Sequence, residues 1–167
     1  MKYGYALSLA FMTMAFLILG SILPGGTLLA GSVPDFLLIL VVYNCMFCGP
    51  AWGGAAGFAI GLAEDLFLGR FIGLNALSKA IVGYLVGRTS KAIFKENLWV
   101  PILNVLWGTL LNYVLVFSVG QVVGNHWPLE LFLWRTSFGT LYNVCLVPLT
   151  YGSYFNFADK YLRSSND

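Results

Sequence analysis

Four long stretches of this chain contain no Asp, Glu, Lys or Arg, and they constrain the fold more than any other feature. They cover residues 3–34, 36–63, 97–129 and 136–158. Hydrophobic residues make up 59% of the chain and charged residues 10%, against roughly 45–50% and 25% in ordinary soluble domains. So much apolar surface leaves too few polar residues to cover a water-soluble core. The sequence therefore predicts an integral membrane protein and excludes a disordered chain or a nucleic-acid-binding module with a basic face.

Turn residues divide these stretches into helices. A helix that crosses a membrane needs roughly 20 mostly apolar residues, and Pro marks breaks because it lacks an N–H and disfavours helix just before it. Breaks fall at Pro24-Gly25-Gly26, at Gly49-Pro50 and at residues 125–128. The expected spans are residues 5–23, 34–48, 51–68, 72–88, 98–122 and 130–157. We predict an all-α, six-helix transmembrane bundle that forms one domain over residues 1–167, with a kink at Pro148.

Lys and Arg in the connecting segments predict the orientation, because cytoplasmic loops are enriched in these residues. With the N-terminus inside, the cytoplasmic side holds Lys2, Arg88, Lys91, Lys95, Lys160 and Arg163. The outer side then holds only Arg70. We therefore expect an even number of spans, both termini in the cytoplasm, and an uncleaved first span rather than a signal peptide.

Small residues at four-residue spacing predict where two spans pack together. The third span and its approach carry Gly49, Gly53, Gly57, Gly61 and then Asp65, and the fourth carries Ala76, Lys79, Ala80, Gly83 and Gly87. Each step of four advances about 40° around a helix, so successive members share a face. Small residues allow helix backbones to approach closely in lipid. We expect an antiparallel hairpin whose packing glycines are Gly53, Gly57, Gly61, Gly83 and Gly87.

The two charged residues on these faces, Asp65 and Lys79, predict an ion pair across the hairpin in the outer half of the membrane. An isolated charge at the centre of a span costs roughly 2.5–3.5 kcal/mol on insertion scales, and pairing reduces that cost. The residue types leave a second interpretation open, in which Asp65 serves a partner or a ligand at the outer face.

Other polar residues belong to the same outer region. Asp35, beside Pro34, is expected to cap the second span, and Glu64 either joins the hairpin contact or faces away from it. Asn104, Asn112 and Asn143 are expected to form hydrogen bonds between helices. The candidate intramembrane polar or partner-binding residues are Asp35, Glu64, Asp65, Lys79, Arg135 and Asn143.

Recognised catalytic chemistry is missing from the sequence. Cys45 and Cys48 form a C-x-x-C, but a metal site needs two further ligands, and His126 and Cys145 are the remaining N or S donors. His126 belongs to an outer connection, whereas the two cysteines lie near the inner end of their span. We therefore predict no catalytic residue, no metal and no cofactor, with the cysteines acting as small apolar residues.

An ordered set of motifs resembles the rod shape-determining protein MreD family. The motifs are Pro34-Asp35-Phe36-Leu37-Leu38, the run from Gly57 to Leu66, Gly69, the run from Gly73 to Leu77, and Gly83-Tyr84-Leu85. The resemblance implies a non-enzymatic protein of the bacterial inner membrane that acts in the cell-wall elongation machinery. It also implies that the protein acts together with MreC, a single-span protein with a periplasmic domain, and with MreB, RodZ, RodA and a transpeptidase. Membrane lipid is the other expected partner, and nucleic acid is not expected.

The same resemblance suggests an alternative function. The MreD family is similar to the substrate-binding S components of energy-coupling-factor transporters, which are small six-span proteins that hold a ligand near the outer face. A small-molecule-binding transporter subunit is therefore the second functional hypothesis, although the outer loops offer few polar groups to fix a ligand. A channel or lipid-binding subunit is disfavoured, because no ring of charged residues is evident. The partner-binding face, the stoichiometry and the presence of a bound lipid stay open.

Overall fold

The computed structural model describes residues 3–22, 31–69, 71–89, 97–123 and 128–163. Over these residues the regular structure consists of six helices: α1 (Tyr3–Ile22), α2 (Phe36–Cys48), α3 (Pro50–Leu68), α4 (Leu74–Thr89), α5 (Trp99–Val122) and α6 (Leu129–Arg163). The prediction of an all-α protein is confirmed, and the helix bounds follow the predicted spans closely. The largest difference is the end of α6, which continues beyond residue 157 to Arg163.

Some of the expected features fall outside the described residues. They are Lys2, the turn at Pro24-Gly25-Gly26, Arg70, Lys91, Lys95, residues 125–127 with His126, and the last four residues. Two of the helices described, with spans Gly4–Ile22 and Trp99–Val122, are long and apolar enough to cross a membrane, and Phe36–Cys48 is a shorter apolar helix. The number of spans and the orientation stay predictions.

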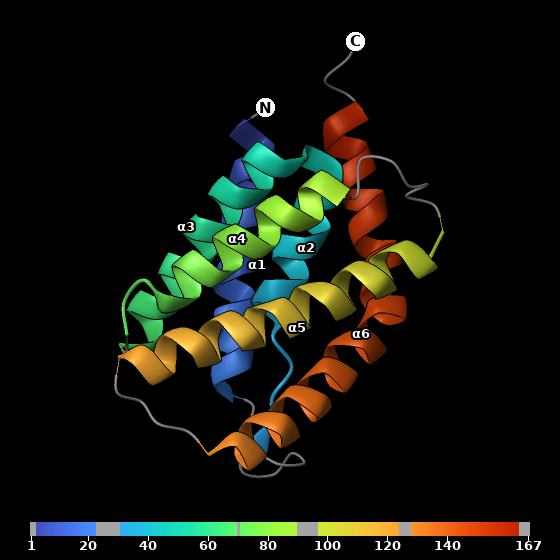
Figure 1. Ribbon diagram of the computed structural model, residues 1–167. Coiled ribbons are helices and arrows are strands. Elements are labelled where there is room, and N and C mark those ends of the chain that lie inside the picture. Colours follow the sequence, from blue (N-terminus) through green and yellow to red (C-terminus); the bar gives the residue numbers. More distant parts are fainter. Residues whose placement is uncertain (1–2, 23–30, 70, 90–96, 124–127, 164–167) are drawn as a thin grey trace.

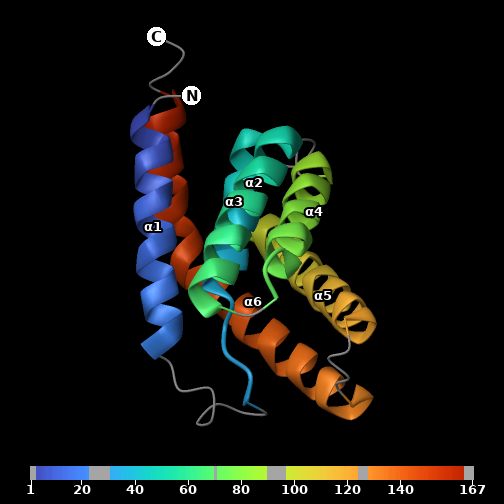
Figure 2. The ribbon, with the colours of Figure 1, turned by 90° about the vertical axis from the view of Figure 1, so that its left-hand side faces the viewer.

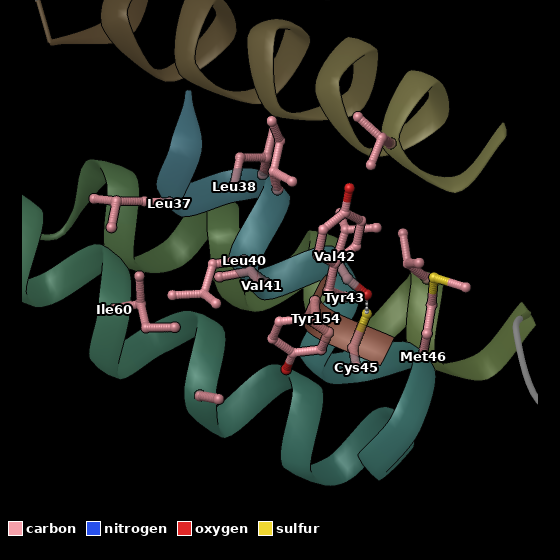
Figure 3. Packing of buried hydrophobic residues seen from close by; sticks show 14 of the residues in the cluster. Leu37, Leu38, Leu40, Val41, Val42, Tyr43, Cys45, Met46, Ile60 and Tyr154 are labelled. Carbon is pink, nitrogen blue, oxygen red and sulfur yellow. Dashed lines mark hydrogen bonds between the residues drawn. The ribbon is translucent and has the colours of Figure 1, made fainter. Parts of the chain in front are cut away.

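Helix α2 lies at the centre of the bundle and contacts each of the other helices. Its residues from Leu37 to Met46 are all buried, as expected for a helix that is apolar all round. Figure 3 shows its side chains, among them Leu40 and Val41, packed with Ile60 of α3 and Tyr154 of α6. By contrast, large apolar side chains on the outer faces of α1, α5 and α6, such as Phe11, Trp107 and Leu149, are largely exposed. Such a distribution suits a protein surrounded by lipid.

The remaining helices surround α2 at different inclinations. Helices α3 and α4 run side by side, and α5 is steeply inclined to α1 (Figures 1 and 2). Helix α6 changes direction partway along its length (Figure 1), and Pro148 lies within this helix. The start of α1 and the end of α6 lie at the same end of the bundle. Near that end the Tyr5 hydroxyl hydrogen-bonds Asn44 Oδ1 (2.8 Å) and Tyr154 Oη (2.9 Å), which ties α1, α2 and α6 together.

Glycines bring the backbones of α3 and α4 into direct contact, and we call this contact the glycine seam. A Cβ built at Gly53 would lie 2.6 Å from the Gly83 carbonyl oxygen, and one at Gly87 would lie 2.8 Å from Pro50 Cα. Side chains on Gly57 and Gly61 would collide with the carbonyls of Lys79 and Asn75. No larger residue fits these positions without moving a backbone. The seam therefore sets the register of the hairpin, and with it the positions of the charged residues on the two helices.

Candidate functional site

Lys79 is fully buried between two carboxylates, and neither of them is the predicted partner, Asp65. Its Nζ lies 2.9 Å from Asp35 Oδ2 and 2.7 Å from Glu64 Oε2. The side chains of these three residues are 0%, 23% and 16% exposed, respectively. Lys79 belongs to α4, Asp35 directly precedes α2, and Glu64 lies in the last two turns of α3. We call Lys79, Asp35 and Glu64 the lysine cluster.

Asp35 connects the lysine cluster to the rest of the fold. Its Oδ1 accepts a hydrogen bond from Leu38 N–H (2.8 Å), which confirms its predicted role as the cap of α2. Its backbone N–H donates to Asn143 Oδ1 (2.8 Å), and Asn143 Nδ2 donates to Thr109 Oγ1 (3.1 Å). Asn143 therefore makes the predicted interhelical bond, linking α6 to α5 and to the start of α2.

The predicted ion pair between Asp65 and Lys79 is wrong. Asp65 accepts hydrogen bonds from the backbone N–H groups of Gly73 (2.8 Å), Asn75 (3.3 Å) and Ala76 (3.1 Å), and from Asn75 Nδ2 (2.8 Å). The short connection brings the end of α3 to the start of α4, whose first N–H groups have no partners within the helix and favour a negative charge. Asp65 therefore caps α4, and its neighbour Glu64, about 100° further around α3, pairs with Lys79.

Removing this cap should weaken the hairpin. We expect Asp65→Ala to lower the free energy of unfolding by about 0.5–2 kcal/mol, because substitution of a helix-capping side chain by alanine has costs of this size. Thermal unfolding of the detergent-purified protein measures the effect. Glu130→Ala is the matched control, since Glu130 is exposed in the first turn of α6. Equal stability of the two variants would contradict the capping role.

The two carboxylates of the lysine cluster outnumber its lysine, and a pocket of about 270 Å³ opens beside them. Its wall combines the end of α1, the start of α2, the end of α3 and part of α5, and it includes Asp35, Glu64, Asn112 and Tyr113. Asn112 is only 6% exposed, and within the described part of the chain its Oδ1 has no hydrogen-bond donor. The interhelical bond predicted for Asn112 is therefore not formed by this oxygen. We call this space the acceptor pocket.

Other residues of α5 and α6 lie outside the lysine cluster. Arg135 is in α6, where its carbonyl accepts a hydrogen bond from Ser32 Oγ (3.2 Å), and it is not part of the lysine cluster. Gly139 lies directly against the Tyr113 hydroxyl, so that a side chain there would displace this wall of the acceptor pocket. Asn104 Nδ2 is buried without an acceptor among the described residues. No role was predicted for Tyr113 from the sequence.

The chemistry of these groups is that of binding and packing. Among the residues that the structure describes, no group of three or more His, Cys, Asp or Glu side chains is arranged to hold a metal ion. Cys45 Sγ donates to the Val42 carbonyl (3.0 Å), and Cys48 Sγ lies 3.8 Å from the Tyr5 hydroxyl oxygen. Both cysteines thus have local partners, as expected for cysteines inside an apolar bundle.

Fold and site together define a helical membrane protein whose most buried charges hold helix ends in place. A family model for the rod shape-determining protein MreD matches residues 1–156, from before α1 to well into α6. This chain belongs to the MreD family, a family of shape-determining membrane proteins. Comparisons with curated proteins and with solved structures give no significant match.

Proposed function

We propose that this protein is a non-enzymatic scaffold of the bacterial cell-wall elongation machinery, which maintains rod shape together with an MreC-like single-span partner. The observation that carries the proposal is the family match over residues 1–156. The proposed location is the inner membrane, with six spans and both termini in the cytoplasm. Support for an even number of spans comes from the start of α1 and the end of α6, which lie at the same end of the bundle.

The architecture suits a protein that works by contact. Its described residues form helices joined by short segments, and their outer faces are apolar. Surfaces open to partners are therefore the membrane-facing sides of the helices, the connections, and the acceptor pocket. A scaffold of this kind would hold a single-span partner through helix packing in the membrane and through contacts at the outer surface.

Depletion tests the function directly. We expect rod-shaped host cells to become rounded when this protein is depleted, and to recover when the wild-type protein is supplied. An MreC-like protein is expected to co-purify with it. Cells that stay rod-shaped, together with a tightly bound small molecule found by mass spectrometry, would contradict the scaffold and favour the transporter alternative.

Reporter fusions test the topology. A fusion at Asn125 is expected to report the outer side and a fusion at Asn166 the cytoplasm, because the Lys and Arg distribution favours cytoplasmic termini. Fusions between Arg88 and Lys95 are avoided, since they would alter the basic segment that sets the orientation. Two fusions on the same side of the membrane would reject the six-span arrangement.

A further inference from the structure

We propose that the acceptor pocket receives the cationic group of one lysine or arginine side chain from a protein partner. This inference rests on the proposed function, because it assumes that a protein binds at this end of the bundle. It extends that function by naming a binding site and the chemistry of its occupant.

The first argument is charge. Asp35 and Glu64 carry two negative charges, and Lys79, which contacts both, supplies one positive charge. The third nearby carboxylate, Asp65, is separately stabilised by the N–H groups at the start of α4. Within the described part of the chain, the lysine cluster therefore holds one carboxylate more than it has basic side chains, in a largely buried place. A charge in this position is costly unless it is paired, so a single cation is the complementary occupant.

The second argument is the set of acceptors. Both oxygens of Asp35 are occupied, by Leu38 N–H and by Lys79. Glu64 contacts Lys79 through Oε2, and no hydrogen bond to its Oε1 is found among the described residues. Asn112 lines the same pocket, and its Oδ1, which is almost fully shielded, has no donor among the described residues. A lysine ammonium offers three N–H donors and an arginine guanidinium five, with no acceptor on either. Such a group can donate to Glu64 Oε1 and supplies a positive charge beside the two carboxylates.

The third argument is shape. Phe16 and Leu17 of α1 and Phe67 and Leu68 of α3 give the pocket apolar walls. Long basic side chains bury their aliphatic stems along apolar surface of this kind. The volume of about 270 Å³ lies below the roughly 300–1,000 Å³ of pockets for drug-sized ligands, which favours one side chain over a larger molecule.

The same lining disfavours a lipid headgroup. Phosphatidylethanolamine also carries an ammonium, but it brings a phosphate that needs donors. The described residues of the pocket wall include no Lys or Arg, and Lys79 is engaged by Asp35 and Glu64. The Ser21 hydroxyl already donates to the Ile18 carbonyl, and the other side-chain donors of the wall, on Asn112 and Tyr113, are uncharged. A lone cation therefore fits better than a zwitterion.

Photo-crosslinking in the host cell tests the site. The probe p-benzoylphenylalanine is placed at Phe67, which is 50% exposed and lines the pocket, or at Phe58, which is 49% exposed on the same helix and away from it. We expect the Phe67 probe to crosslink a second protein within a few residues of a lysine or arginine. Adding Glu64→Gln should lower this yield about tenfold, the effect of losing one hydrogen bond to a charged group. Products of the Phe58 probe should not change.

Glu64→Gln leaves the Asp35–Lys79 pair neutral, so the variant is expected to fold, and its melting temperature checks this. Asn112→Leu provides a second route, because it removes a polar side chain from the pocket wall without changing any charge, and it should also lower the Phe67 yield. In the partner, replacing the identified lysine or arginine by methionine should reduce the crosslink similarly, whereas exchange of Lys for Arg, or the reverse, should preserve it.

Several results would overturn the inference. They are crosslinks to phosphatidylethanolamine alone, a partner segment without a basic residue, or a Phe67 yield unchanged in both folded pocket variants. The proposed function fails separately: rod shape retained after depletion would reject it even if the Phe67 crosslink depended on Glu64. If depleted cells become rounded but the Phe67 crosslink yield is the same in the Glu64→Gln and Asn112→Leu variants, only the assignment of the pocket is rejected.

Discussion

Lys79→Met is expected to lower the free energy of unfolding by roughly 3–5 kcal/mol, because removing one member of a buried ion pair strands the partner charge. Here two carboxylates, Asp35 and Glu64, would be left together beside Lys79's former position. Methionine keeps most of the length and volume of the side chain, so that the missing charge dominates the effect. Thermal unfolding of the purified protein, together with the yield of folded protein from membranes, provides the measurement.

Double variants identify the partner of Lys79. Combining Lys79→Met with Glu64→Gln should cost clearly less than the sum of the single effects, because one stranded charge is removed. Combining Lys79→Met with Asp65→Asn should come close to the sum, since Asp65 binds the start of α4 and makes no ion pair with Lys79. If Lys79 showed as large a coupling energy with Asp65 as with Glu64, it would form an ion pair with Asp65, contrary to the structure.

Gly57→Ala should destabilise the protein, whereas Gly54→Ala, the same change about one helical turn away in α3, should not. A Cβ at Gly57 would collide with the Lys79 carbonyl and lie 3.2 Å from Ala80 Cα. Overpacking of this kind costs about 1–3 kcal/mol. A Cβ at Gly54 would meet its nearest neighbour, Tyr84 Cβ, at 3.4 Å, which is ordinary contact. Alanine is favoured over glycine within a helix by roughly 1 kcal/mol, so Gly54→Ala should be neutral or stabilising.

The melting temperatures of the Gly57→Ala and Gly54→Ala proteins, measured in the same detergent, test this prediction. Gly61→Leu should behave like a stronger form of Gly57→Ala, because its side chain would enter the backbone around Asn75. Phe58→Leu is the control on the exposed face of α3 and should have little effect. A Gly57→Ala protein at least as stable as the Gly54→Ala protein would show that α3 and α4 are not packed through these glycines.

The helices themselves could be read from the sequence because their signals are local. Hydropathy and the Gly and Pro breaks placed all six helices, within two residues at every end except that of α6, since a helix in apolar surroundings satisfies its own backbone. The four-residue glycine spacing likewise pointed to the face through which α3 contacts α4, because periodicity along one helix is a property of the sequence alone. The resemblance to the MreD family rested on these same segments and is confirmed.

The partners of the charged residues were decided by the tertiary structure. Glu64 and Asp65 are adjacent in sequence but face directions about 100° apart, so their roles depend on where the next helix begins. Asp35 reaches Lys79 across 44 positions of sequence, a contact that no spacing within either helix can indicate. Asn112 and Asn143 look alike in their helices, yet only Asn143 meets Asp35 and Thr109. Helix formation follows from neighbours along the chain, whereas pairing of buried charges follows from the register and inclination at which separate helices pack.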